Sequence, residues 1–246
     1  MTLASPSTKP RRLAALGLVA MLFAACSSIP AVSPSASPAP LPTVPPTAPP
    51  YSLAPSPSGC PTSAPAPLTG TATVTMVTNF GTIVIKADSS LGPNAAGMFV
   101  AMSQCGYYND VLFHRIIKDF VIQSGDGTNA REPNPNLAKM GQGGPGWTIK
   151  DDPTKTDLVR GMVAVANTGS ADSGGSQFFI ILSDSAFAKG TTAYSIIGTV
   201  TSGMDVADRI AQVPTGGEPE QQGGAAGSGS MPLQPVVILT TTVTTP

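Results

Sequence analysis

One arginine stands where the surrounding residues predict a buried strand. Arg115 lies within the apolar run 111–117, and a second run, 120–123, follows after Lys118 and Asp119. This pattern predicts two short strands joined by a tight turn. A buried strand rarely carries a guanidinium unless that group is paired or has a chemical task. Arg115 is therefore a candidate catalytic residue, and a structural arginine that reaches a partner or solvent is the alternative.

Histidine chemistry is nearly absent from this chain. His114 is the only histidine in 246 residues. This excludes a His-rich metal site and a Ser-His-Asp triad built on any other histidine. Because neighbours on a strand point to opposite faces, His114 is interpreted as structural, facing away from Arg115. The net charge of −1 gives no broad basic surface for nucleic acid. We expect no metal, no cofactor and no nucleic-acid partner.

Residues 1–26 are predicted to be a targeting segment. A lysine and two arginines precede an apolar run at 13–23, which is too short for a convincing membrane span. Small residues directly before Cys26 resemble a bacterial lipoprotein signal, in which the cysteine carries lipid. Because Phe23 departs from that pattern, a plain signal peptide or an uncleaved anchor is the alternative. Each interpretation places the remainder outside the cytoplasm, on the outer face of the cytoplasmic membrane or secreted.

Residues 27–69 form a segment dominated by Pro, Ser, Ala and Thr. A segment with so little apolar periodicity is predicted to be a disordered, extended linker. At roughly 3 Å per residue it could hold a domain on the order of 100 Å from a membrane. A stalk through part of the cell envelope is the functional interpretation. An unselected tether and a docking site for a proline-binding module are the alternatives.

Two cysteines remain if Cys26 carries lipid. In an oxidising compartment, an even pair of cysteines indicates a disulfide. We therefore predict a Cys60–Cys105 bond that fastens the end of the linker to the folded body. Two free buried thiols are the alternative, which the Pro/Ser surroundings of Cys60 disfavour because they offer no core.

Residues 70–246 are sufficient for one compact domain. Their apolar and turn residues predict about eight short strands and two helices. The strands are expected at 72–77, 82–87, 111–117, 120–123, 161–167, 176–182, 194–200 and 235–243, and the helices at 93–104 and 204–211. Dispersed short strands predict a mainly β fold, here a closed eight-stranded antiparallel barrel capped by two helices. The glycine-rich run at 141–146 lacks a following Gly-Lys-Ser/Thr, so it is predicted to be an irregular loop, with Trp147 as a packing residue.

Several separated motifs resemble those of the cyclophilin family. They occur in order at residues 113–117, 120–126, 143–146, 164–167, 175–180 and 194–198, so that the resemblance covers essentially all of 72–243. It implies a peptidyl-prolyl cis-trans isomerase whose eight-stranded barrel is closed by two helices. That architecture agrees with the elements expected from the residues alone.

The resemblance also implies roles for individual residues. Arg115 matches the family's catalytic arginine, and Phe120 and Gln123 complete the expected catalytic group. The expected substrate-binding residues are Val121, Ala166, Asn167, Gln177, Phe179, Phe187 and Tyr194. Among them, Val121 replaces a common methionine, Phe187 stands where tryptophan is frequent, and Tyr194 stands where the family has a pocket histidine. The turn at 168–175 and the loop at 188–194 are longer than usual.

The chemistry of X–Pro rotation explains why such residues would suffice. Amide resonance raises a barrier of roughly 18–20 kcal/mol, so that uncatalysed isomerisation takes tens to hundreds of seconds. A guanidinium aimed at the prolyl nitrogen can donate to it once its lone pair leaves conjugation, and an apolar pocket can hold the ring. No nucleophile, base or metal is required.

Two functions follow from the sequence. The first is an active, surface-anchored isomerase that helps exported proteins fold, acting as a monomer on proline-containing polypeptides. The second is a catalytically weak peptide-binding or chaperone module of the cell envelope. Joint retention of Arg115, Phe120, Gln123 and Phe179 favours the first, and a purely structural lipoprotein would leave these residues unexplained.

Overall fold

The computed structural model describes residues 59–152, 156–216 and 228–246. The predicted targeting segment at 1–26, including Cys26, lies outside these residues, as does the predicted linker up to residue 58. Within the described ranges, no helix combines the length and the apolar character needed to cross a membrane.

The sheet begins with the predicted hairpin. β1 (Thr71–Thr78) and β2 (Gly81–Asp88) pair antiparallel along their whole length. Alternate side chains face the core, which the sequence pattern of these strands requires. On β1 the buried residues are Ala72, Val74 and Met76, and on β2 they are Ile83, Ile85 and Ala87.

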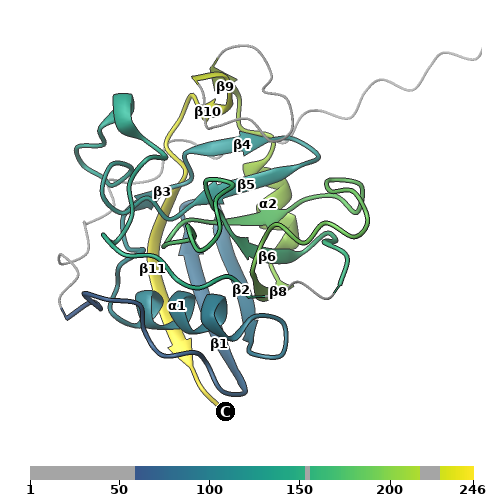
Figure 1. Ribbon diagram of the computed structural model, residues 1–246. Helices are drawn as coiled ribbons and strands as arrows, with labels where there is room; N and C mark the ends of the chain where they lie inside the picture. The colour runs from purple at the N-terminus through teal and green to yellow at the C-terminus, as the bar shows by residue number, and fades with distance from the viewer. Residues whose placement is uncertain (1–58, 153–155, 217–227) are drawn as a thin grey trace, which may run out of the picture. The chain divides into compact units, whose positions relative to one another are not determined.

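Nine strands form one curled sheet (Figure 1). Their order is β3-β11-β1-β2-β8-β6-β7-β5-β4, and every pairing is antiparallel. The strands beyond the hairpin are β3 (Val111–Leu112), β4 (Arg115–Ile117), β5 (Val121–Ser124), β6 (Met162–Val165), β7 (Phe178–Ile181), β8 (Ile196–Ser202) and β11 (Val237–Thr244). The mainly β class is therefore confirmed.

The prediction of a closed eight-stranded barrel is wrong, because the sheet is an open, strongly curled half-barrel. The expected strand at 111–117 is divided at Phe113 and His114 into β3 and β4, which are the two edge strands. The backbone N–H of Phe113 donates to Val236 O beside β11, whereas that of His114 donates to Gln123 O on β5. One segment thus contributes to both edges of the sheet without pairing them to each other.

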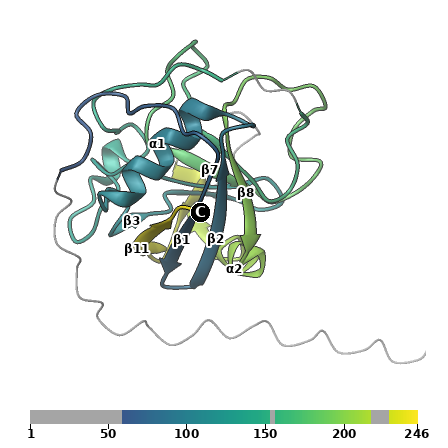
Figure 2. The same cartoon turned by 90° about the horizontal axis from the view of Figure 1, so that it is seen from below.

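Two helices flank the sheet, as predicted. α1 (Pro93–Gln104) contacts β2, β8 and β11, and α2 (Met204–Ile210) packs on β2 (Figures 1 and 2). The helix α1 begins at a proline. Its first turn is capped by Asp152, a residue distant in sequence, whose carboxylate accepts from the backbone N–H of Ala95 at 2.8 Å. The buried side chains of α1 include Met98, Phe99 and Met102.

The strands at the centre of the sheet are buried on both faces. Consecutive residues of β7 separate into two clusters: Phe178 joins the main core under α1, and Phe179 joins a second cluster on the opposite face. β5 divides in the same way, with Ile122 in the main core and Val121 in the second cluster. The main core therefore supports, from behind, the face that carries the second cluster.

A short segment before β1 is fastened along α1. We call residues 60–68 the N-terminal strap. The predicted disulfide joins Cys60 to Cys105 at the end of α1, with an S–S distance of 2.07 Å. At the other end of the strap, the backbone N–H of Leu68 donates to Pro93 O at 2.9 Å. The structure thus places residues that the sequence assigns to the linker, 60–68, against the domain.

Four short elements were not predicted. The two-residue strands β9 (Thr215–Gly216) and β10 (Met231–Pro232) pair with each other, and single-turn helices occupy η1 (Leu137–Lys139) and η2 (Ser228–Ser230). Elements of two or three residues leave no periodic signal in a sequence.

Candidate active site

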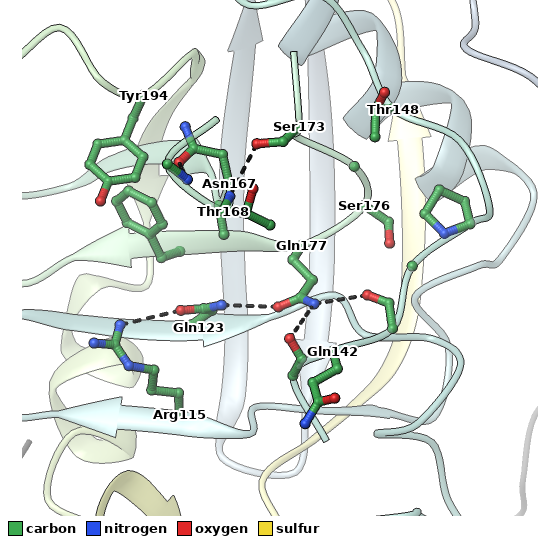
Figure 3. A pocket seen from close by; sticks show the side chains of 18 of the residues that line it. Arg115, Gln123, Gln142, Thr148, Asn167, Thr168, Ser173, Ser176, Gln177 and Tyr194 are labelled. Carbon is green, nitrogen blue, oxygen red and sulfur yellow. Dashed lines mark hydrogen bonds between the residues drawn. The ribbon is translucent and has the colours of Figure 1, made fainter. Parts of the chain in front are cut away.

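A cavity of about 710 Å³ opens on the face of the sheet opposite the main core (Figure 3). Every residue predicted for catalysis or substrate binding lines it: Arg115, Phe120, Val121, Gln123, Ala166, Asn167, Gln177, Phe179, Phe187 and Tyr194. The structure therefore brings these residues together in one cavity. Their individual roles stay predictions.

Strand register brings the central residues of this site together. Arg115 on β4 is opposite Gln123 on β5, which in turn is opposite Phe179 on β7. The next strand, β6, continues the row with Ala164. Directly opposite residues on paired strands have neighbouring side chains on the same face. The row therefore carries a cation, an amide and an aromatic ring across one wall of the cavity.

A chain of side-chain hydrogen bonds orients the guanidinium (Figure 3). Arg115 Nη1 donates to Gln123 Oε1 at 3.3 Å, and Gln123 Nε2 donates to Gln177 Oε1 at 3.0 Å. Gln177 Nε2 then donates to the carbonyl oxygens of Gly141, at 2.9 Å, and Gly143, at 2.8 Å. Arg115 is only 6% exposed. The buried guanidinium is thus oriented by a neutral amide oxygen, that of Gln123.

The loop that ends this chain is itself fixed by a buried carboxylate, Asp126. Asp126 Oδ2 accepts from the backbone N–H groups of Gly141, at 2.8 Å, and Gly143, at 3.0 Å. Its Oδ1 accepts from Thr128 N at 3.1 Å and Asn129 N at 2.8 Å. A Cβ on Gly143 would collide with Asp126 Oδ1, so only glycine permits this approach. Sequence reasoning did not single out Asp126; the only signal was its place at the end of the 120–126 motif.

Aromatic rings form the apolar end of the cavity. The Phe187 ring lies 5.0 Å from that of Phe120 and 5.7 Å from that of Phe179, between centroids. Tyr194 meets Phe179 edge-on at 5.1 Å. Arg115 Cζ lies 5.8 Å from the centroid of Phe120, which is within the range of a cation–π contact. An apolar pocket thus lies directly beside the oriented guanidinium.

Asn167 connects the two loops that border this pocket. Its Nδ2 donates to Ala193 O at 2.6 Å, and its Oδ1 accepts from Gly169 N at 3.1 Å. The neighbouring Ala166 N–H donates to Gln177 O at 2.9 Å. The side chain of Asn167 therefore bonds within the protein and holds the segment that leads to Tyr194.

His114 faces away from the cavity, as predicted. It is 2% exposed, and neither ring nitrogen has a hydrogen-bond partner among the described residues. Burial lowers its pKa from 6.5 to about 4, because the charged imidazolium would lose its hydration. The ring is therefore neutral at pH 7.

The other half of the cavity is a region that sequence reasoning largely missed. It is lined by the glycine-rich loop with Gln142, Trp147 and Thr148, and by Thr168, Ser173 and Ser176 on the facing side. Trp147 packs against the main core, as predicted, and it also lines the cavity. Glycine content had indicated only an irregular loop, because a loop that borders a site has no periodicity to mark it.

The arrangement suits a reaction that needs orientation and charge rather than covalent chemistry. Within the described ranges, no three His, Cys, Asp or Glu side chains are grouped so that they could hold a metal ion. The cavity instead offers a fixed N–H donor beside an apolar pocket in an open groove. Such a site can hold a small ring and donate to an atom next to it.

Comparison with known proteins identifies the family. The family model described as "Cyclophilin type peptidyl-prolyl cis-trans isomerase/CLD" matches residues 73–243. The chain is 33% identical over 173 residues to peptidyl-prolyl cis-trans isomerase cyp18 of Streptomyces antibioticus, covering 68% of this chain and 95% of that protein. It is 34% identical over 175 residues to a peptidyl-prolyl cis-trans isomerase of Acinetobacter baylyi, covering 68% and 82%.

The fold agrees with this assignment. The crystal structure of a cyclophilin type peptidyl-prolyl cis-trans isomerase from Cryptosporidium parvum matches with a TM-score of 0.56 at 24% identity, covering 72% of this chain and 99% of that one. The residues matched by the family model, 73–243, include the strands that carry the cavity. The chain therefore belongs to the cyclophilin-type peptidyl-prolyl cis-trans isomerases.

Proposed function

We propose that this isomerase acts through Arg115 on proline-containing segments of exported proteins, at the cell envelope. The observation that carries the catalytic part is the position of Arg115, buried beside an apolar pocket and oriented by Gln123. A related solved structure, that of the Cryptosporidium parvum protein with a TM-score of 0.55, was determined in the presence of the dipeptide Ala-Pro. That ligand supports an X–Pro bond as the substrate of this groove.

The mechanism follows from the electronic structure of the amide. In the planar ground state, the prolyl nitrogen shares its lone pair with the carbonyl, so it is a poor acceptor. As the C–N bond twists, the lone pair returns to nitrogen and can accept from Arg115. The bond from Arg115 is therefore stronger in the transition state than in the ground state, which is the condition for faster turnover. The rings of Phe120, Phe179 and Phe187 would hold the pyrrolidine while the preceding carbonyl rotates.

The envelope location rests on two independent features. The N-terminal segment has the charge and apolar pattern of an export signal that ends at Cys26. The Cys60–Cys105 disulfide supports the same location, because such bonds persist in oxidising compartments and are rare in the cytosol. Incorporation of labelled palmitate into the parent chain, with Cys26→Ser as the control, tests the anchor. Equal labelling of both chains would refute lipidation at Cys26.

The catalytic role of Arg115 is tested by the rate of cis-to-trans conversion of an Ala-Pro peptide. Arg115→Ala should reduce kcat/KM by about 100-fold or more, the usual effect of removing one transition-state donor. Arg209→Ala is the matched control, since Arg209 is an exposed arginine on α2. Circular dichroism should show all three proteins folded. Turnover that survives Arg115→Ala would refute this role, and a folded parent without turnover would favour the peptide-binding alternative.

A further inference from the structure

The N-terminal strap reaches the substrate groove through one side chain. Trp147 Nε1 donates to Pro61 O at 3.0 Å, and Pro61 directly follows the disulfide-bonded Cys60. The indole is partly buried against the main core and also lines the cavity. Trp147 therefore contacts the disulfide-anchored strap and also forms part of the cavity wall.

The strap has little freedom to move along α1. Its first residue is bonded to Cys105, and its last residue, Leu68, is hydrogen-bonded to Pro93 at the beginning of the helix. Between these points, Ala66 O lies so close to Gly97 that a Cβ there would collide with it. The position of Pro61 O is thus fixed by contacts on α1, an element outside the groove.

Trp147 is in turn part of a loop that contacts the facing side of the groove. Two residues later, Ile149 N–H donates to Gly174 O at 2.8 Å. A Cβ on Gly175 would lie 3.4 Å from Pro145 Cδ and 3.4 Å from the backbone carbonyl oxygen of Trp147, so the two segments are close neighbours. These contacts align the loop at 141–148 with the segment that leads into Gln177. A displacement of the indole would therefore alter the half of the groove away from the aromatic pocket.

We propose that Trp147 is a positioning residue for substrate binding and that the disulfide-anchored strap sets its place. The inference rests on the proposed function, since it assigns the half of the groove beside Trp147 to residues that flank the proline. The strap acts on how tightly an extended peptide binds. It leaves the chemical step at Arg115 unchanged, because the Gln123–Gln177 chain is anchored separately by Asp126.

Two perturbations act at opposite ends of this connection. Trp147→Phe keeps an aromatic ring but removes the N–H donor to Pro61, with the disulfide intact. The double variant Cys60→Ser/Cys105→Ser removes the anchor and retains the indole. Each should raise KM roughly 3- to 10-fold for a long peptide with a central Ala-Pro, the effect of losing about one neutral hydrogen bond. Neither should change kcat, nor the kcat/KM of a blocked Ala-Pro dipeptide.

A double-mutant cycle tests the connection itself. If the strap and the indole act through the same contact, their effects on KM should not add. The triple variant Trp147→Phe/Cys60→Ser/Cys105→Ser should then have the same KM as Trp147→Phe or Cys60→Ser/Cys105→Ser. Trp147 is the only tryptophan, so its fluorescence reports this site directly. Removal of the disulfide should shift the emission of the indole, whereas a variant of a distant exposed residue, Arg209→Ala, should not.

Three outcomes would overturn the inference. The first is additive changes in KM. The second is an equal decrease in kcat/KM for the long peptide and the dipeptide. The third is an emission spectrum of Trp147 that is unchanged when the disulfide is removed. Because Trp147→Phe retains the disulfide, the KM test stands even if the serine variant does not fold. A parent that lacks turnover would refute the proposed function alone. The Kd of the long peptide, measured by calorimetry, then replaces KM in the same cycle.

Discussion

Asp126→Asn should weaken the support of Arg115 through a residue that does not itself line the cavity. The carboxylate accepts four backbone N–H groups, two on each oxygen. Asparagine has nearly the same shape but only one acceptor oxygen. If Oδ1 keeps its two donors, the new NH₂ group faces the N–H groups of Gly141 and Gly143, so that donor meets donor.

The size of the effect follows from the bonds that are lost. Each hydrogen bond to a charged group contributes about 1.5–3 kcal/mol, so losing two should lower the free energy of unfolding by about 3–6 kcal/mol. The loop would then no longer hold the carbonyl oxygens of Gly141 and Gly143 in place, and Gln177 donates to both of them. We therefore expect kcat to fall as well, though less than in Arg115→Ala, because Asp126 acts through other residues.

Urea unfolding and X–Pro turnover measured on the same samples separate these effects. Asp205→Asn is the matched control, since Asp205 is an exposed aspartate on α2 with 74% of its side chain accessible. It should match the parent in both assays. An Asp126→Asn protein with the parent's urea midpoint and the parent's kcat would refute the assignment of this carboxylate as the anchor. A loss of stability with unchanged kcat would refute its connection to Arg115.

Two further predictions concern stability. Cys60→Ser/Cys105→Ser should lower the free energy of unfolding by about 4 kcal/mol, from the chain entropy released across the 45-residue separation, and an unchanged urea midpoint would contradict this. Because the pKa of His114 is lowered to about 4 by burial, the unfolded chain binds a proton near pH 6.5 that the folded chain binds only near pH 4. Stability should therefore be greatest above pH 6.5 and fall by on the order of 3 kcal/mol between pH 6.5 and 4. His114→Leu should flatten that part of the urea-derived stability profile, and identical profiles would refute the neutral buried imidazole.

Resemblance to the cyclophilin family supplied the residues of the site, whereas strand alternation, a local property, predicted that His114 faces away from Arg115. Phe178 and Phe179 are adjacent, and the period of a strand places them on opposite faces whatever the surrounding fold. Register could not be predicted in this way. That Arg115 lies opposite Gln123 depends on the turn between β4 and β5, which includes Asp119 with a φ of 59°.

The break between β3 and β4 left no signal of this kind. Residues 111–116 are all buried, so burial does not mark the break. What divides the segment is the destination of two backbone N–H groups: that of Phe113 donates to Val236 O beside β11, and that of His114 donates to Gln123 O on β5. Val236 is distant from Phe113 in sequence, so only the folded sheet brings it to this segment. The open sheet with nine strands therefore depends on tertiary structure.

The strap was missed for a related reason. Residues 60–68 have the composition of a linker, and they bury little apolar surface of their own. Their position is determined by one covalent bond and a few backbone contacts with α1, none of which requires periodicity. Only the pairing of Cys60 with Cys105 was visible in the sequence, and it indicated where the strap begins but not its path.

The direction of the hydrogen-bond chain explains how two buried charges are accommodated without direct contact. From Asp126 outward, each bonded group presents its N–H toward the carboxylate and its C=O toward Arg115. The side-chain amides of Gln177 and Gln123 therefore point the same way, and hydrogen bonds in such a chain strengthen one another. The anion lies at the donor end and the cation at the acceptor end, so both charges are stabilised. A carboxylate in place of Gln123 could accept from Arg115 but could not donate onward, which explains why an amide suits this position.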